Sequence, residues 1–150
     1  MFSLKDKIIL VTGSTGYLGR AISEGLAKMG AKVYINGRTE SSVNKTVDSL
    51  IKKGYRAEPA IFDITDYKQV EIFFSNFDED VIDVLLINAY NGKGGTTNTS
   101  SKQDFRDSYE ISMIATHNLF QNSLPYLQSA KNRNGDASVV NISSMYGMVS

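Results

Sequence analysis

Residues 8–20 of the chain read Ile8-Ile9-Leu10-Val11-Thr12-Gly13-Ser14-Thr15-Gly16-Tyr17-Leu18-Gly19-Arg20. The apolar run at the start predicts a buried strand, the G-x-x-G-x-x-G glycines predict a tight turn, and a helical pattern begins behind them. A strand, a glycine turn and a helix N-terminus form a site for a pyrophosphate, because the first helical N–H groups attract anions. The stretch therefore predicts a nucleotide cofactor, held by Gly13, Ser14, Thr15, Gly16, Tyr17, Leu18 and Gly19, and leaves the reaction open.

Length and composition narrow the class of protein. The chain has 150 residues, 16 basic and 16 acidic, and no cysteine. Balanced charge argues against a nucleic-acid binder or a polybasic membrane surface, and the missing cysteines exclude a disulfide frame and a thiolate metal site. No apolar run approaches the ~20 residues that cross a bilayer, and the charged N-terminus is unlike a secretory signal. We therefore expect one domain, a cytoplasmic location, and neither nucleic-acid nor membrane partners.

Strand and helix patterns alternate along the whole chain. Apolar runs predict strands over residues 8–11, 32–35, 56–62, 81–88 and 137–142. Helical patterns begin behind Gly16, behind Thr39 and behind Asp66, where Gln69 three positions on resembles a capping box. With short connections, this alternation predicts an α/β fold: a doubly wound parallel sheet, or Rossmann fold, with helices on both faces.

A longer helical pattern covers residues 102–129 and follows a polar loop over residues 91–101. Its apolar residues predict one buried face, made of Phe105, Tyr109, Met113, Thr116, Phe120, Leu124 and Leu127. Pro125 lies inside the pattern, so we expect a kink or an end near it.

The residues after the second strand distinguish between the two nicotinamide cofactors. In NAD sites a carboxylate about 20 residues beyond the turn binds the ribose 2′-hydroxyl. This chain has Asn36-Gly37-Arg38 there. A carboxylate would repel a 2′-phosphate, whereas an arginine offers charge and several donors. Arg38, with Asn36 beside it, therefore favours NADP(H) over NAD(H), although Arg38 could also be a solvated loop residue.

Four segments together resemble the short-chain dehydrogenase/reductase family: the turn at residues 12–19, Asp63-Ile64, Asn88-Ala89, and residues 139–147. The resemblance implies that Asp63 contacts the adenine amino group with Ile64 beside it, and that the segment Asn88-Ala89-Tyr90 lies along the cofactor. Ser144, in a Ser-x-x-Gly sequence, would polarise the carbonyl of the substrate. Asp63 could instead simply cap a turn.

The chain departs from the family pattern at three places. The glycine spacing is that of the extended subfamily, although the other motifs resemble the shorter reductases. Tyr90 stands where the family usually has glycine. Ser112 aligns with the helix asparagine of the family's proton relay, so it is either a relay residue or a filler of the helix interior.

We assign no function to His117 and predict no metal site, because no set of ligands has metal-binding spacing.

The family's Tyr-x-x-x-Lys pair is absent from residues 1–150, since no tyrosine has a lysine four positions later. We expect these residues to be the N-terminal portion of a longer reductase, a domain incomplete at its C-terminal end and inactive alone. The apolar fifth strand supports this expectation, because an edge strand would expose its side chains. By resemblance, the full-length protein would be a homo-dimer or homo-tetramer.

The sequence thus predicts an oxidoreductase that transfers a hydride between NADP(H) and a small carbonyl or alcohol substrate, with Ser144 and Ser112 as candidate catalytic residues. A non-catalytic nucleotide-binding or sensing domain is one alternative. A sugar-nucleotide epimerase or dehydratase is another, suggested by the glycine spacing.

Overall fold

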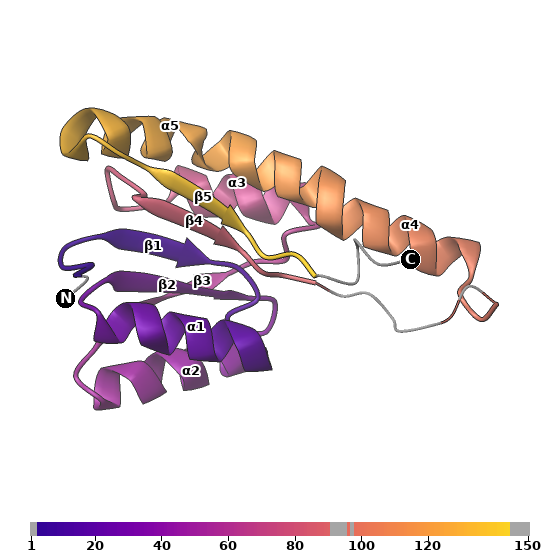
Figure 1. Ribbon diagram of the computed structural model, residues 1–150, viewed down its shortest axis with the longest axis horizontal. Coiled ribbons are helices and arrows are strands. Elements are labelled where there is room, and N and C mark those ends of the chain that lie inside the picture. The colour runs from indigo at the N-terminus through magenta and orange to yellow at the C-terminus, as the bar shows by residue number, and fades with distance from the viewer. Residues whose placement is uncertain (1–2, 91–95, 97, 145–150) are drawn as a thin grey trace.

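The computed structural model describes residues 3–90, 96 and 98–144. Along them run β1 (Ile8–Val11), α1 (Tyr17–Lys28), β2 (Lys32–Gly37), α2 (Glu40–Lys52), β3 (Arg56–Ile61), α3 (Tyr67–Ser75), β4 (Val84–Ile87), α4 (Lys102–Tyr109), a π-helix η1 (Glu110–Ala115), α5 (Thr116–Asn134) and β5 (Ser138–Asn141). This alternation confirms the predicted α/β class (Figure 1).

All five strands pair in parallel, in the order β3-β2-β1-β4-β5. The chain builds outward from β1 through β2 to β3, and then crosses to the other side of β1 to form β4 and β5. Ligands of such sheets bind beyond the carboxyl ends of the strands, at the point where the winding reverses. That point lies between β1 and β4, where the glycine turn begins.

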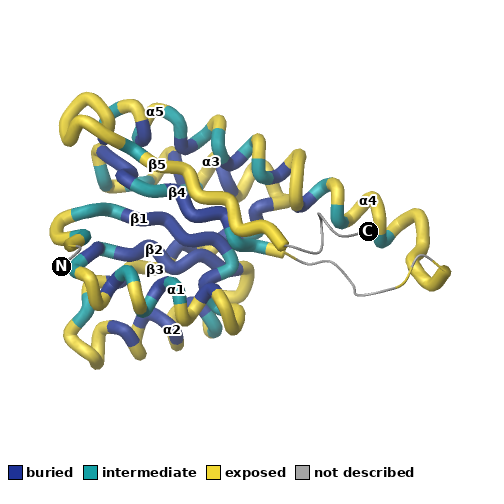
Figure 2. Tube along the Cα trace, viewed as in Figure 1, coloured by how far each residue is buried: buried dark blue, intermediate teal, exposed yellow. Residues whose placement is uncertain are grey.

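Helices cover both faces of the sheet, α1 and α2 on one and α3 and α5 on the other (Figure 1). Successive side chains of a strand point to opposite faces. In β1, Ile9 and Val11 pack in the core beneath α1 and α2, whereas Leu10 packs in the core beneath α3 and α5. All three are fully buried (Figure 2), as expected for a central parallel strand.

The N-terminus of α3 has the predicted cap. The carboxylate of Asp66 accepts the backbone N–H of Gln69 at 3.1 Å. The Gln69 side chain does not complete a capping box: its amide donates to Asp66 at 2.8 Å, and its carbonyl accepts the backbone N–H of Asp63 at 3.0 Å. The cap therefore also holds the backbone of Asp63, which lies two residues after the end of β3.

The long helix differs from the prediction in two ways. It continues through Pro125 to Asn134, and its irregularity is the π-helix at Glu110–Ala115. The predicted buried face is also wrong in its first half, because Phe105 is 75% exposed and Tyr109 and Met113 are exposed as well. The residues that do face the core share an i, i+4 spacing: Ile111, Ala115, Leu119, Ser123 and Leu127.

The two strands beyond the reversal point depart from their predicted lengths and environment in different ways. β4 is shorter than the predicted 81–88, although the preceding Ile82 is fully buried. β5 forms an edge of the sheet, and every one of its residues is exposed. The apolar side chains of Val139 and Val140 therefore face solvent, as we expected of an uncovered edge strand.

A polar cluster lies at the amino ends of the strands, away from the glycine turn. Glu79 accepts hydrogen bonds from Lys32 at 2.7 Å and from the Tyr34 hydroxyl at 2.9 Å. The Lys32 bond, followed by the Tyr34 bond, lowers the pKa of Glu79. Burial, with Glu79 second, raises the pKa of Tyr34. These hydrogen bonds stabilise the fold, and none of the three residues lines the cavity at the glycine turn.

Candidate functional site

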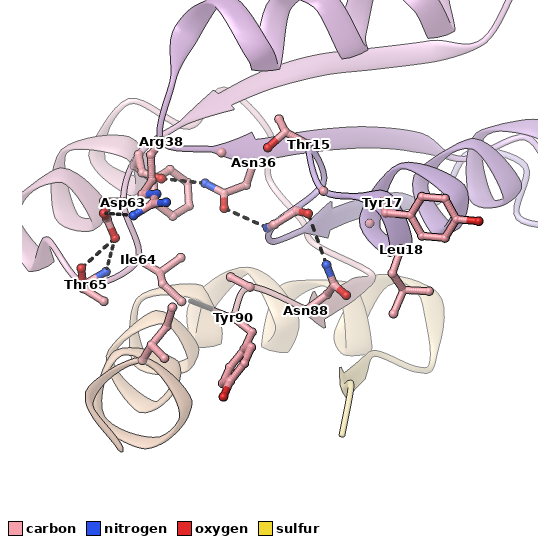
Figure 3. Close-up of a pocket in the computed structure, with 17 residues that line it drawn as sticks. Thr15, Tyr17, Leu18, Asn36, Arg38, Asp63, Ile64, Thr65, Asn88 and Tyr90 are labelled. Atoms are coloured by element: carbon pink, nitrogen blue, oxygen red, sulfur yellow. Dashed lines mark hydrogen bonds and ion pairs between the residues drawn. The ribbon is translucent and has the colours of Figure 1, made fainter. Parts of the chain in front are cut away.

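A cavity of about 400 Å³ opens at the carboxyl ends of β1, β2, β3 and β4, within the size range of ligand pockets (Figure 3). Its lining includes most of the residues predicted to bind the cofactor. The complete lining is Gly13, Thr15, Gly16, Tyr17, Leu18, Gly19, Asn36, Gly37, Arg38, Phe62, Asp63, Ile64, Thr65, Asn88, Ala89, Tyr90 and Ile111. Residues from five separate segments of the sequence therefore meet at the carboxyl ends of the strands.

Two glycines of the turn are required by close backbone contacts. Gly13 has φ +64°, and a Cβ there would lie 2.9 Å from the Cα of Ala89. A Cβ on Gly19 would lie 2.8 Å from the Cα of Ser14, so α1 could not approach β1 as closely. A Cβ on Gly16 would meet only the Gly13 carbonyl, at 3.4 Å, so the protein itself tolerates one. Gly16 instead keeps the cavity side of the turn open.

The N-terminus of α1 faces this cavity and offers an anion site. Gly16 is its N-cap and has no side chain to accept the first helical N–H groups, and the first turn contains no acidic residue. Tyr17 and Leu18 provide N–H groups of that turn, while Tyr17 is 98% exposed and its ring points away from the turn (Figure 3). Unpaired N–H groups and the helix dipole together attract a phosphate.

The side chains of Ser14 and Asn36 stabilise the glycine turn through hydrogen bonds. The Ser14 hydroxyl is buried; it donates to the Val11 carbonyl and accepts the backbone N–H of Asn36 at 3.2 Å. The Asn36 side chain, 2% exposed, donates to the carbonyls of Ala60 and Phe62, each at 3.0 Å, and accepts Gly13 N–H at 3.4 Å. Both side chains thus serve the protein's own hydrogen bonds, and Ser14 lies outside the cavity lining.

Thr12 joins the turn to the end of β4. Its hydroxyl accepts the backbone N–H groups of Asn88 and Ala89 at 2.9 and 3.1 Å. The Asn88 amide donates back to the carbonyls of Thr12 and Gly13 at 3.1 and 3.3 Å. Thr12 is fully buried, so its hydroxyl fixes the cavity wall through these backbone groups.

The opposite end of the cavity carries its charged side chains (Figure 3). Nη1 of Arg38 lies 3.8 Å from Oδ2 of Asp63. Oδ1 of Asp63 accepts the Thr65 backbone N–H at 2.9 Å and the Thr65 hydroxyl at 2.7 Å. Asp63 therefore caps a turn and lines the cavity at once, and Arg38 stands beside it with most of its side chain in solvent.

The π-helix contributes the remaining wall. Ile111 lines the cavity, and its carbonyl accepts the Thr116 hydroxyl at 3.2 Å. The preceding Glu110 accepts a hydrogen bond from the Tyr67 hydroxyl, which raises the pKa of Tyr67. Insertions of this kind within α-helices occur often at functional sites.

Ser112 and Ser144 are not among the residues that line the cavity. Ser112 is exposed on the π-helix, directly after Ile111. Ser144 is exposed and follows β5 at the same sheet edge as Asn88, since Ile87 pairs with Asn141. Ser144 thus lies beyond the carboxyl end of β5 and Ser112 adjoins a residue of the cavity wall, while Met145, Tyr146 and Gly147 of the family motif lie outside the described residues.

Phe62, Thr65 and Ile111 also line the cavity, although no motif in the sequence singles them out. Phe62 and Thr65 flank the predicted pair Asp63-Ile64, and Ile111 precedes the predicted Ser112, so closeness in sequence was the available signal.

Among residues 3–90, 96 and 98–144, no group of three acidic or histidine side chains could hold a metal ion. Within the same part of the chain, no helix combines the length and hydropathy that a bilayer crossing requires.

The profile of a protein family described as short chain dehydrogenase matches residues 7–150. The chain is similar to 5-keto-D-gluconate 5-reductase of Escherichia coli (strain K12), with 29% identity over 147 residues that cover 97% of this chain and 56% of that protein. The chain spans about half the length of the curated relatives that it matches.

Solved structures show the same likeness. A 7α-hydroxysteroid dehydrogenase complexed with NADH and 7-oxo glycochenodeoxycholic acid superposes with a TM-score of 0.86 at 25% identity, over 100% of this chain and 60% of that one. The F189W actinorhodin polyketide ketoreductase with NADPH gives a TM-score of 0.83 at 25% identity, over 99% and 57%.

Proposed function

The chain belongs to the short-chain dehydrogenase family, and from this premise we propose that it is the cofactor-binding portion of an NADP(H)-dependent carbonyl reductase or alcohol dehydrogenase. The single observation that carries the proposal is the cavity at the glycine turn, with Arg38 at the end where an NAD site carries a carboxylate. Because the chain spans about half of its relatives, the activity is proposed for the protein of which these residues form part.

The residues of the cavity fit a dinucleotide. A Cβ at Gly13 or Gly19 would collide with neighbouring backbone, so the turn keeps its shape only with glycine at these positions, and Gly16 leaves its cavity side open for a pyrophosphate. The uncapped N-terminus of α1 would hold the phosphates. Asp63, Ile64 and Thr65 would surround the adenine, and Asn88, Ala89 and Tyr90 would lie along the other half of the cofactor.

Arg38 favours the cofactor with the 2′-phosphate. Its guanidinium is mostly in solvent, so a phosphate can approach it and receive two parallel hydrogen bonds. Gly37 stands where a carboxylate would select NAD, and a Cβ there would already lie 2.9 Å from the Thr15 methyl group. The position therefore disfavours a side chain of any kind.

The nicotinamide, when bound, supplies the hydride. Ser144 would donate a hydrogen bond to the carbonyl oxygen of the substrate as negative charge develops there. Ser112 would hold a water in the proton path from its place on the π-helix. We propose that the proton donor and the strand that covers β5 come from chain beyond these 150 residues.

Titration of NADPH and of NADH into the purified protein, followed by cofactor fluorescence, tests the proposal. We expect saturable binding of both, with NADPH the tighter. Tighter binding of NADH would contradict the NADP assignment, and binding of neither would contradict the function. Oxidation of NADPH by the full-length protein against a panel of ketones and aldehydes then tests the reaction.

One observation favours a different function, a cofactor sensor without catalysis. Ser112, in the position of the family's relay asparagine, has a shorter side chain than asparagine. Tight NADPH binding by the full-length protein, with no turnover on any carbonyl of the panel, would support the sensor and contradict the reductase.

A further inference from the structure

Asp63 holds its carboxylate in one orientation at the charged end of the cavity. Oδ1 accepts two hydrogen bonds from Thr65, one from the backbone N–H at 2.9 Å and one from the hydroxyl at 2.7 Å. Oδ2 is the oxygen next to Arg38, at 3.8 Å from Nη1 (Figure 3). The backbone N–H of Asp63 is itself fixed by the Gln69 side chain at 3.0 Å. The carboxylate is therefore a fixed charge, and Arg38 is the partner that can move.

The geometry of this ion pair leaves Arg38 only loosely held. A separation of 3.8 Å exceeds the 2.7–2.9 Å of a charge-assisted hydrogen bond, so the two groups attract each other mainly through their charges. The Arg38 side chain is mostly exposed, which adds solvent screening. A phosphate can offer the same guanidinium two shorter hydrogen bonds and a larger charge.

We propose that Asp63 competes with the 2′-phosphate of the cofactor for Arg38, and thereby sets how strongly the chain prefers NADPH to NADH. The inference rests on the proposed function, because it concerns the affinity of the same site for these two cofactors. Asp63 acts against the 2′-phosphate in two ways: it offsets the charge of Arg38 before the cofactor arrives, and it repels the phosphate afterwards. NADH lacks that phosphate and experiences neither effect.

The comparison of two cofactors isolates this effect from any other contact of Asp63. Adenine is identical in NADPH and NADH, so a change in an adenine contact alters both affinities equally and cancels in their ratio. The ratio therefore reports only on the 2′ position. Asp63→Asn removes the charge while the amide oxygen still accepts hydrogen bonds from Thr65, so the turn keeps its shape.

The experiment measures dissociation constants of NADPH and NADH by fluorescence titration for the wild-type chain and for Asp63→Asn. We expect the ratio of NADPH affinity to NADH affinity to rise about three- to tenfold, the effect of one carboxylate near a partly solvated phosphate. Raising the salt concentration should shrink this gain, because ions screen exposed charges.

Asp66→Asn is the matched control. Asp66 lies three residues further on, accepts the Gln69 N–H, and can be replaced by asparagine as a helix cap at little cost. Its variant removes the same charge from the same loop and leaves both members of the Arg38–Asp63 pair in place, with the Gln69 side chain as the link between Asp66 and the Asp63 N–H. We expect its ratio to stay within about twofold of the wild type, since a more distant charge is largely screened.

A double-mutant cycle completes the test. In an Arg38→Gln background, Asp63→Asn should raise the ratio clearly less than it does in the wild-type background, because the competition for Arg38 is gone and only the direct repulsion of the phosphate remains. An unchanged ratio in the Asp63→Asn single variant would overturn the inference alone, as would an equal gain in the Arg38→Gln background. Failure of the wild-type chain to bind either cofactor would overturn the proposed function and the inference with it.

Discussion

The hydroxyl of Thr12, at the end of β1, accepts the backbone N–H of Asn88, at the end of β4, at 2.9 Å. The same oxygen accepts the next N–H, that of Ala89, at 3.1 Å. These bonds join the two strands where the winding of the sheet reverses, which is where the cavity opens. One buried side chain therefore holds both walls of the glycine turn in place.

Thr12→Val tests this link, because valine keeps the shape and removes the acceptor. Two backbone N–H groups in a largely buried position would lose their partner, so we expect the free energy of unfolding to fall by about 1–3 kcal/mol. Urea denaturation measures the change. Thr12→Ser keeps the hydroxyl and should lose less, and equal stability of the two variants would contradict the role of the hydroxyl.

Gly19→Ala should damage both the fold and the site. A Cβ at this position would lie 2.8 Å from the Cα of Ser14, so α1 must move away from β1. We expect a loss of about 2 kcal/mol or more in stability, and weaker NADPH binding because the turn moves with the helix. Gly25→Ala is the control on the same helix, where nothing lies within 4 Å of the new Cβ. It should be neutral or stabilising, by up to about 1 kcal/mol.

Arg38→Gln should weaken NADPH binding far more than NADH binding. The variant removes the only charge that we assign to the 2′-phosphate, so the NADPH affinity should fall about 10- to 100-fold, as for a lost charge-assisted pair. The salt dependence of NADPH binding should also become shallower. Arg133→Gln, at the other end of the sheet near the C-terminus of α5, serves as control and should leave both affinities unchanged. An equal loss for both cofactors would contradict the assignment.

Glu79 should contribute stability at neutral pH that the protein loses in acid. Its pKa is lowered, first by the hydrogen bond from Lys32, so the unfolded chain binds the proton more readily than the folded one. The resulting stability is present above the ordinary pKa of 4.5 and is lost as the pH falls through the lower, folded-state pKa. Glu79→Gln should reduce the free energy of unfolding by roughly 1 kcal/mol at pH 7.

The difference between Glu79→Gln and the wild type should then shrink below pH 4.5 and disappear once the pH has fallen through the lowered pKa of the folded-state carboxyl group, where that group is protonated in the folded protein too. Chemical denaturation at a series of pH values measures it. A difference that stays constant down to that pH would show that the contribution of Glu79 does not come from its charge.

Much of the fold follows from local patterns in the sequence. The run Ile8–Val11, the helix behind Gly16 and the cap at Asp66 lie where the sequence predicted them. Each depends on neighbours in the chain: a continuous apolar run, a glycine turn before a helical repeat, an acceptor three residues before a donor. The buried face of the long helix was mispredicted, because a π-helix at Glu110–Ala115 interrupts the spacing on which that prediction relied.

The sequence by itself determined the strand–turn–helix unit, and with it the place of a nucleotide site, since glycine spacing and hydrophobic periodicity act over a few residues. Only the tertiary structure decided what each polar side chain does there. It turned the hydroxyls of Thr12 and Ser14 inward to satisfy buried backbone groups, and it placed Asp63 beside Arg38. Ser14 and Asn36 are 22 residues apart, Arg38 and Asp63 are 25 apart (63 − 38), and Thr12 and Asn88 are 76 apart, and no local pattern specifies such contacts.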